Sequence, residues 1–191
     1  MSLDMRSTLI DVATGQVRRL GYSAFSYADL AAAVGIRKPS IHHHFPAKED
    51  LGVAIVAAYT ERLSEQLDRI DEKTGDMIER LRAYARIYRE GLQAKRGCLC
   101  GVLASEVAVL PQRVQASVRQ FFGLHLRWLE RVLRDGRSAG SLRDGVEPRR
   151  EARTVLAAYQ GALFLALSLE EPAAFDQAVA SLFKGLRAEH A

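Results

Sequence analysis

The segment from Phe25 to Leu51 constrains the fold of this chain more than any other, because it predicts two short helices joined by a glycine turn. Ser26 suits the N-cap of the first helix, and the residues that follow it supply a buried face of about two turns. Gly35 then provides the positive φ angle that ends a helix. The segment therefore predicts a tight turn that leads into a second helix.

The second helix of this segment is short and polar. Because a proline is tolerated only in the first turn of a helix, Pro39 places the helix start near Lys38, and the helix runs to about His44. Ile41 and Phe45 lie four residues apart and share its buried side. The exposed side is left to Lys38, Ser40, His42, His43 and His44. Cationic, hydroxyl and imidazole side chains on an exposed helix suit contacts with DNA, so we predict a helix-turn-helix; a generic helical hairpin with a polar face is the alternative.

The remaining segments predict helices only. Apolar residues recur at three- and four-residue steps, with glycines and prolines between the periodic runs. We expect these helices near residues 9–20, 48–71, 77–94, 101–109, 111–137, 148–168 and 172–186. With the two short helices this is an all-α fold of about nine helices. We expect residues 1–47 to form the helix-turn-helix head and residues 48–191 a helical bundle, with the helix over 48–71 as the connector.

Composition narrows the class of protein without deciding it. The 191 residues are 48% hydrophobic and 26% charged, with a formal net charge of +4. The longest apolar run, residues 162–167, is too short to span a membrane, and the first residues carry no export signal. We therefore expect a cytoplasmic protein. The sequence also lacks a glycine-flanked nucleophile, a phosphate loop, paired catalytic carboxylates and an HExxH motif, so we predict no enzyme activity and no cofactor.

The last two predicted helices indicate a second copy of the chain. Nearly every position from Val155 to Leu169 is apolar or small, so that helix needs cover on most of its surface. The final helix also carries an apolar stripe, from Phe175 to Leu186. A two-fold interface made by two helices of each subunit would bury both surfaces, although the two helices could also bury each other within one subunit. Such a homodimer would place its recognition helices in major grooves about one helical turn apart, near 34 Å, and would prefer a pseudo-palindrome.

Residues 9–59 resemble the N-terminal domain of the TetR/AcrR family of bacterial transcriptional regulators. The resemblance rests on Gly21-Tyr22, on the helix from Ser26 to Gly35, on the recognition helix from Lys38 to Phe45, and on Lys48 to Leu51. It implies a double-stranded DNA operator as partner. The candidate DNA-binding residues are Ser26, Tyr27, Arg37, Lys38, Pro39, Ser40, His42, His43, His44 and Lys48. Arg37 replaces a small hydroxyl residue, and His42 and His44 replace tyrosines that are common in the family, which leaves the base preference open.

The resemblance also implies that residues 48–191 form an effector-binding and dimerisation domain. The chain is then a repressor that a small-molecule, electrophile or oxidant effector releases from its operator. The segment from Gly97 to Glu106 resembles a G-C-L-x-G-x-L-A-x-E element of one TetR subgroup, some members of which respond to electrophiles or oxidants. The candidate effector pocket comprises Tyr84, Tyr88, Cys98, Cys100, Phe121, Phe122, His125, Trp128, Tyr159 and Phe164. Aromatic residues at helical spacing also serve simply as core.

The two cysteines leave two readings open. Residues two positions apart make a strained disulfide, and a metal site would need further ligands, because neighbouring histidines on a helix diverge; we predict no metal site. Cys98 and Cys100 are therefore either thiol sensors, if Lys95, Arg96 or a helix N-terminus lowers a thiol pKa, or buried packing residues. The alternative function is a non-catalytic helical dimer that acts as a thiol sensor or protein-binding module without specific DNA readout.

Overall fold

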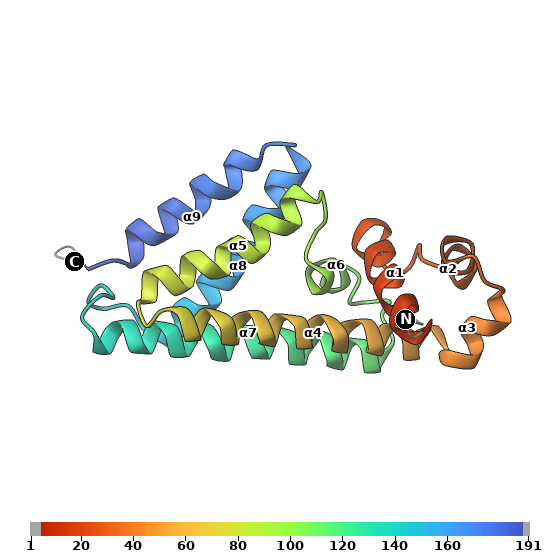
Figure 1. Ribbon diagram of the computed structural model, residues 1–191. Coiled ribbons are helices and arrows are strands. Elements are labelled where there is room, and N and C mark those ends of the chain that lie inside the picture. The colour runs from red at the N-terminus through yellow and green to blue at the C-terminus, as the bar shows by residue number, and fades with distance from the viewer. Residues whose placement is uncertain (1–4, 189–191) are drawn as a thin grey trace. The chain divides into compact units, whose positions relative to one another are not determined.

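The computed structural model describes residues 5–188, and every regular element in this part of the chain is a helix, apart from one isolated bridge between Leu142 and Arg187 (Figure 1). The helices are α1 (Met5–Leu20), α2 (Tyr27–Val34), α3 (Lys38–His44), α4 (Lys48–Lys73), α5 (Met77–Gln93), α6 (Leu99–Ser105), α7 (Gln112–Ser138), α8 (Pro148–Ser168) and α9 (Pro172–Leu186). The predicted all-α fold of about nine helices is confirmed.

The helices form two compact units. The first contains the residues up to Leu63 together with Cys98–Phe121, and the second contains Ser64–Gly97 together with the residues from Phe122 onward. Helices α4 and α7 each contribute residues to both units. The boundary that we expected after residue 47 stays a prediction.

Local signals set the ends of α2 and α3 in the first unit. Ser26 caps α2 through a capping box, in which its hydroxyl accepts from the Asp29 N–H while the Asp29 carboxylate accepts from the Ser26 N–H. Gly35 ends α2 in the left-handed conformation at φ 75°. Pro39 lies in the first turn of α3, which begins at Lys38. The predicted helix-turn-helix segment therefore has the expected helix boundaries.

The core of the second unit is built around α5. Its buried positions recur at helical spacing from Met77 to Leu92, and α5 packs against both α8 and α9, which also pack against each other. Gly136 of α7 lies so close to Met77 that a Cβ at position 136 would stand 2.2 Å from the Met77 sulfur. This close approach of α7 and α5 requires glycine.

A polar network in the second unit links helices α4, α5 and α7. The Asp71 carboxylate of α4 accepts from the Trp128 indole N–H at 3.0 Å and from Arg131 at 2.6 Å. Arg80 of α5 lies 3.5 Å from Asp71 and donates to Asp135 of α7 at 2.8 Å. Because Arg80 and Asp71 are mostly shielded from water, these pairs fix how α4, α5 and α7 meet within this unit.

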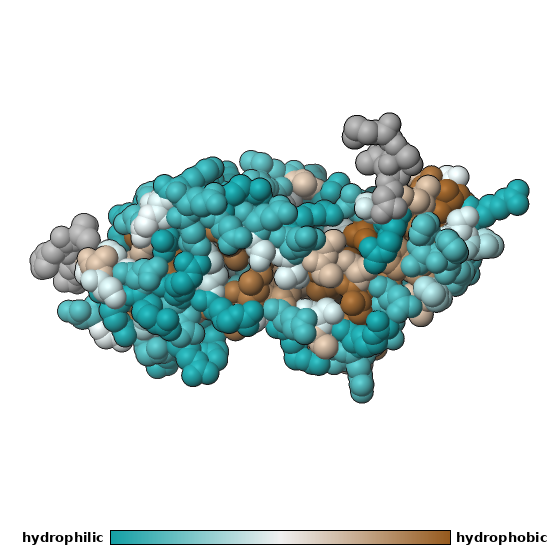
Figure 2. Space-filling view, turned by 60° about the horizontal axis from the view of Figure 1, so that its bottom comes forward, coloured by the Kyte–Doolittle hydropathy of each residue, from teal (hydrophilic) through white to brown (hydrophobic). Residues whose placement is uncertain are grey.

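The surface gives no sign of a membrane span. None of the described helices is long and apolar enough to cross a bilayer. The face shown in Figure 2 is mostly hydrophilic, with hydrophobic side chains visible between the hydrophilic ones.

Candidate nucleic-acid interface

Helix α3 presents a polar surface over an apolar underside. Ile41 is fully buried and Phe45 is 2% exposed, so these two residues anchor the helix in the first unit. His44 is half-buried. The exposed side carries Arg37, Lys38, Pro39, Ser40, His42 and His43. The structure thus brings six of the ten predicted DNA-binding residues together on one exposed surface.

The ring of His42 is held in a defined orientation. Its Nδ1 lies 3.2 Å from the carbonyl oxygen of Pro46, and because a carbonyl only accepts, this contact places a proton on Nδ1. The edge of the Tyr27 ring lies against the same imidazole, with ring centroids 5.0 Å apart. In that tautomer the Nε2 atom, on the opposite edge of the exposed ring, carries a lone pair and is left to accept a hydrogen bond from a donor on a base edge.

Tyr27 does not present the exposed side chain that we expected. It is 7% exposed, and its hydroxyl lies 2.9 Å from the carbonyl oxygen of Phe45 and 2.8 Å from that of Ala47. Burial, followed by the nearby Asp50 and Tyr22, raises the pKa of Tyr27 to about 12. The first residue of α2 therefore fixes the C-terminal end of α3 from within, and we correct its role from DNA contact to support of the recognition helix.

Lys48 also differs from the expectation. Its ammonium group donates to the carbonyl oxygen of Tyr22 at 2.6 Å and lies 4.5 Å from the centre of the Tyr22 ring and 5.5 Å from that of Phe25. Burial lowers the pKa of Lys48, while the charge of Glu106 opposes that shift. Lys48, which we expected to contact DNA, instead forms a brace between the start of α4 and the turn after α1.

Glu106 completes this brace, a role that no pattern in the sequence indicated. Its carboxylate accepts from the Tyr22 N–H and the Ser23 N–H, each at 2.8 Å, and from the Ser23 hydroxyl. Burial raises the pKa of the Glu106 carboxyl, but the bonds from Ser23 and Tyr22 and the charge of Lys48 outweigh it, so the pKa is lowered. The end of α6 thus holds the turn between α1 and α2.

Aromatic side chains from three helices meet in the core of the second unit. The Tyr84 ring lies 5.3 Å from the rings of Tyr88, Trp128 and Tyr159, and its hydroxyl bonds to the Tyr88 hydroxyl at 3.0 Å and to Nδ1 of His125. Burial lowers the pKa of His125 to about 3, so its imidazole is neutral. We call these five residues the aromatic cluster; it is a polar network inside an apolar core.

Comparison with known proteins identifies the family. Residues 77–182 match the family described as "Tetracyclin repressor-like, C-terminal domain", and residues 9–55 match "Bacterial regulatory proteins, tetR family". The chain belongs to the TetR family. It is a DNA-binding transcriptional regulator with the helix-turn-helix head and helical C-terminal domain of that family, as the resemblance of residues 9–59 predicted.

Individual TetR-family relatives agree with this assignment over most of the chain. The transcriptional regulator AcuR of Cereibacter sphaeroides is 27% identical over 83% of this chain and 74% of its own length. The transcriptional repressor DhaR of a Mycobacterium species is 26% identical over 95% of this chain and 92% of its own. The crystal structure of a TetR-family regulator from Agrobacterium tumefaciens superposes with a TM-score of 0.92, at 32% identity, over 96% of this chain and 97% of the other.

The ten residues expected to line an effector pocket of this TetR-family regulator divide between the two units. Five of them form the aromatic cluster, and Phe122 lies 6.5 Å from His125 at its edge. Phe121 belongs to the first unit and stacks on Tyr59 with ring centroids 5.6 Å apart. Phe164 is 37% exposed on α8. The exposed position of Phe164 is inconsistent with a wall of an internal pocket, and we correct that expectation.

Cys98 and Cys100 are free thiols of the first unit, and both are buried, at 6% and 0% exposure. A sensor needs a thiolate, which requires a lowered pKa. Burial, reinforced by the neighbouring Cys98, instead raises the pKa of Cys100. The environment of Cys100 therefore favours the packing interpretation. Within residues 5–188 no three His, Cys, Asp or Glu side chains are grouped to hold a metal ion, and the expected absence of a metal site stays a prediction.

Arg6 is a candidate DNA contact that the sequence did not indicate. Its guanidinium lies 5.1 Å from the centre of the Phe45 ring, so the exposed start of α1 reaches the end of α3. An arginine beside a recognition helix suits a phosphate contact. The proximity of Arg6 to Phe45 is visible only in the structure, because the two residues are far apart in the sequence and belong to no common motif.

Proposed function

We propose that this TetR-family regulator is a repressor that occupies a pseudo-palindromic operator through α3 and leaves it when an effector binds. The observation that carries the proposal is the surface of α3, where six exposed polar or proline positions stand over the buried Ile41 and Phe45. An exposed helix of this composition gains little from packing and suits a major groove. The description of DhaR as a transcriptional repressor supports the direction of regulation.

The candidate contacts divide by chemistry. Arg37 and Lys38 supply charge for phosphate oxygens at the start of α3, where the helix N-terminus also attracts anions. Ser40, His42 and His43 supply hydrogen-bonding groups for base edges or phosphates. Ser26 stays in the candidate set, although its side chain also caps α2. Tyr27 and Lys48 support the interface without contacting DNA: Tyr27 holds the end of α3, and Lys48 holds the start of α4. We assign no catalytic role to any residue, and a regulator of bacterial DNA works in the cytoplasm.

The outer face of α8 supports a homodimer through the last two helices. Phe164, Leu165 and Leu169 are 37%, 52% and 56% exposed, and they follow the small exposed residues Ala157 and Gly161 along the helix. Because α8 and α9 already pack against each other on their inner sides, the apolar outer face of α8 is left for a second copy. Exposed positions of α9, among them small residues, would extend the same interface.

The aromatic cluster is the region that we propose for the effector. Its hydroxyls and neutral imidazole offer hydrogen bonds without a fixed charge, which suits a small uncharged molecule. Binding there would act on α5 and α7, and a repositioned α4 would spoil the fit of two heads to their grooves. An electrophile that reacts at Cys98 is the second candidate effector, carried by the resemblance of the Gly97–Glu106 segment.

Selection of bound fragments from the genome of the source bacterium, followed by footprinting, tests the proposal. We expect enrichment of a few sites with two-fold related half-sites, and protection of both halves. If no genomic fragment bound more tightly than scrambled DNA at any salt concentration, that result would contradict specific recognition of a DNA sequence. That result would favour the alternative of a helical dimer that binds proteins or senses thiols without an operator.

A further inference from the structure

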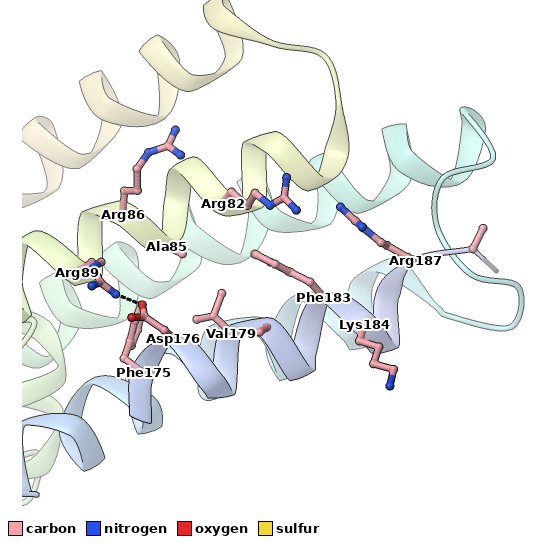
Figure 3. A pocket seen from close by; sticks show the side chains of 12 residues that line it. Arg82, Ala85, Arg86, Arg89, Phe175, Asp176, Val179, Phe183, Lys184 and Arg187 are labelled. Atoms are coloured by element: carbon pink, nitrogen blue, oxygen red, sulfur yellow. Dashed lines mark ion pairs between the residues drawn. The ribbon is translucent and has the colours of Figure 1, made fainter. Parts of the chain in front are cut away.

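A groove lies on the surface of the second unit, between α5 and α9, outside the aromatic cluster. It encloses about 780 Å³, which is within the range of small-molecule sites. We propose that this groove binds an amphipathic organic anion, a carboxylate with a medium-length aliphatic chain. Figure 3 shows the groove with α5 on one side and α9 on the other.

The floor of the groove is an apolar strip. Phe175, Val179 and Phe183 follow one another at four-residue steps along α9, and Ala85 of α5 faces them. Three such positions span about 12 Å along a helix, since each residue rises about 1.5 Å. These side chains are 1–8% exposed, so an extended aliphatic chain laid along the strip would cover the small part of their apolar surface that still faces the groove. The floor therefore selects for a hydrocarbon body.

The walls of the groove carry an excess of positive charge. Among the described residues that line it, five are cationic and Asp176 is the single acid, and Asp176 is ion-paired with Arg89. The whole chain is much closer to balance, with 27 basic and 23 acidic residues. Arg82 pairs with Glu79 and Arg89 with Asp176, whereas within the described residues no ion pair involves Arg86, Lys184 or Arg187. Charge complementarity therefore selects for an anionic head group.

The cations are not spread evenly around the groove. In Figure 3 the side chains of Arg82 on α5 and Arg187 after α9 extend toward each other at one end of the apolar strip. Arg86 and Lys184 point away from the gap between the helices in the same view. Two guanidinium groups at one end of an apolar strip match a carboxylate at one end of an aliphatic chain. This geometry favours a ligand with one charged end over a ligand with distributed charge.

The groove also contacts the aromatic cluster. Phe175 belongs to the apolar floor, and its ring lies 6.4 Å from that of Tyr88 and 6.2 Å from that of Tyr159. A bound chain would press on a side chain that is 1% exposed and packed against two members of the cluster. A ligand in the groove would therefore change the packing of the aromatic cluster in the core of this unit.

Isothermal titration calorimetry of the purified full chain with octanoate tests the proposal without any DNA. Octanol serves as the neutral ligand of the same chain length. We expect Arg82→Gln, Arg187→Gln and Ala180→Glu each to weaken octanoate binding about tenfold, because each removes or opposes one favourable charge. Ala180 lines the groove but is exposed, so the added charge disturbs no core contact. Arg119→Gln, a change of an exposed arginine in the first unit, should leave the affinity unchanged.

Circular dichroism confirms that each variant is folded before titration. Octanoate binding that all three groove variants leave unchanged would contradict the site. Equal affinity for octanol would contradict the role of the arginines, and failure of octanoate to bind would contradict the ligand class. Binding of an acidic amphipathic peptide in place of octanoate would assign the groove to a protein partner and overturn the proposal.

Discussion

The carboxylate of Glu106 accepts a hydrogen bond from the backbone N–H of Tyr22 at 2.8 Å, across 84 positions of sequence. Glu106 ends α6, a helix that begins directly after Cys98, and Tyr22 lies in the turn that positions α2 and α3. The Lys48 ammonium group donates to the backbone carbonyl oxygen of Tyr22. The three residues therefore join α6, the head and the start of α4 within the first unit.

Replacement of Glu106 by glutamine should destabilise the first unit by about 1 kcal/mol. This value is small for hydrogen bonds to a charged group, because the Glu106 carboxylate is partly exposed to water. The lowered pKa of Glu106 gives the sign of its pH dependence. Its contribution is present above the pKa of the unfolded chain, near 4.3, and is lost as the pH falls through the folded value.

Urea denaturation at neutral and acidic pH measures this effect. Glu61→Gln, at an exposed position of α4, is the matched control and should change stability little at either pH. Identical denaturation midpoints for the two variants would show that Glu106 does not hold the turn.

His125 should make the protein sensitive to mild acid. Burial lowers its pKa to about 3, whereas an unfolded histidine titrates near 6.5, so below that pH the unfolded chain binds a proton that the folded chain does not. Stability should fall by about 2 kcal/mol between about pH 7.5 and about pH 5 from this residue alone. Thermal or urea unfolding of His125→Gln across the same range should show a smaller decline. Parallel pH profiles would contradict a neutral buried imidazole.

The contact between Gly136 and Met77 predicts a large effect from one methyl group. Gly136→Ala would place a Cβ 2.2 Å from the Met77 sulfur and 2.9 Å from the Met77 Cβ, so the helices must shift, at a cost of about 1–3 kcal/mol. Gly15→Ala, in α1 with no atom near the added methyl, should instead stabilise by about 0.5–1 kcal/mol. Denaturant midpoints that move in the same direction for both variants would contradict this packing.

The proposed dimer interface can be tested on α8. Phe164→Glu and Leu165→Glu place charge on its exposed apolar face, and we expect sedimentation velocity to show a shift from dimer toward monomer. Val109→Glu is the control, since Val109 is 68% exposed but lies in the first unit, after α6. A monomeric wild-type chain at micromolar concentration, or a dimer that tolerates both α8 changes, would argue against this interface.

The sequence was most informative where local chemistry sets the structure. The boundaries of α2 and α3 followed from Ser26, Gly35 and Pro39, because caps and proline act within one helical turn. Because α2 and α3 are short, the periodicity of their apolar residues does not show whether the Tyr27 side chain faces inward or outward. The fold turned its ring inward, so a residue that the family resemblance assigned to DNA became a support for α3.

Residues that act across long sequence separations could not be predicted. Nothing near Lys48 or Glu106 indicates that they meet the two sides of Tyr22, and nothing near Arg82 indicates Arg187 at the same end of a groove. These contacts depend on how helices pack, which a pattern along one helix does not encode. Five of the ten residues that we expected to line an effector pocket meet in the aromatic cluster, because they recur on the buried faces of α5, α7 and α8, and their role in effector binding stays a prediction.

We propose that the exposed side of α3 reads DNA. Fluorescence anisotropy with a duplex from upstream of the regulator's own gene, against scrambled DNA across a salt series, tests it directly. We expect tighter binding to the upstream duplex. Lys38→Ala should weaken that binding about tenfold and reduce the salt slope by about one, while Arg119→Ala leaves both unchanged. Equal binding of wild type and Lys38→Ala to a sequence that the protein prefers would contradict the claim.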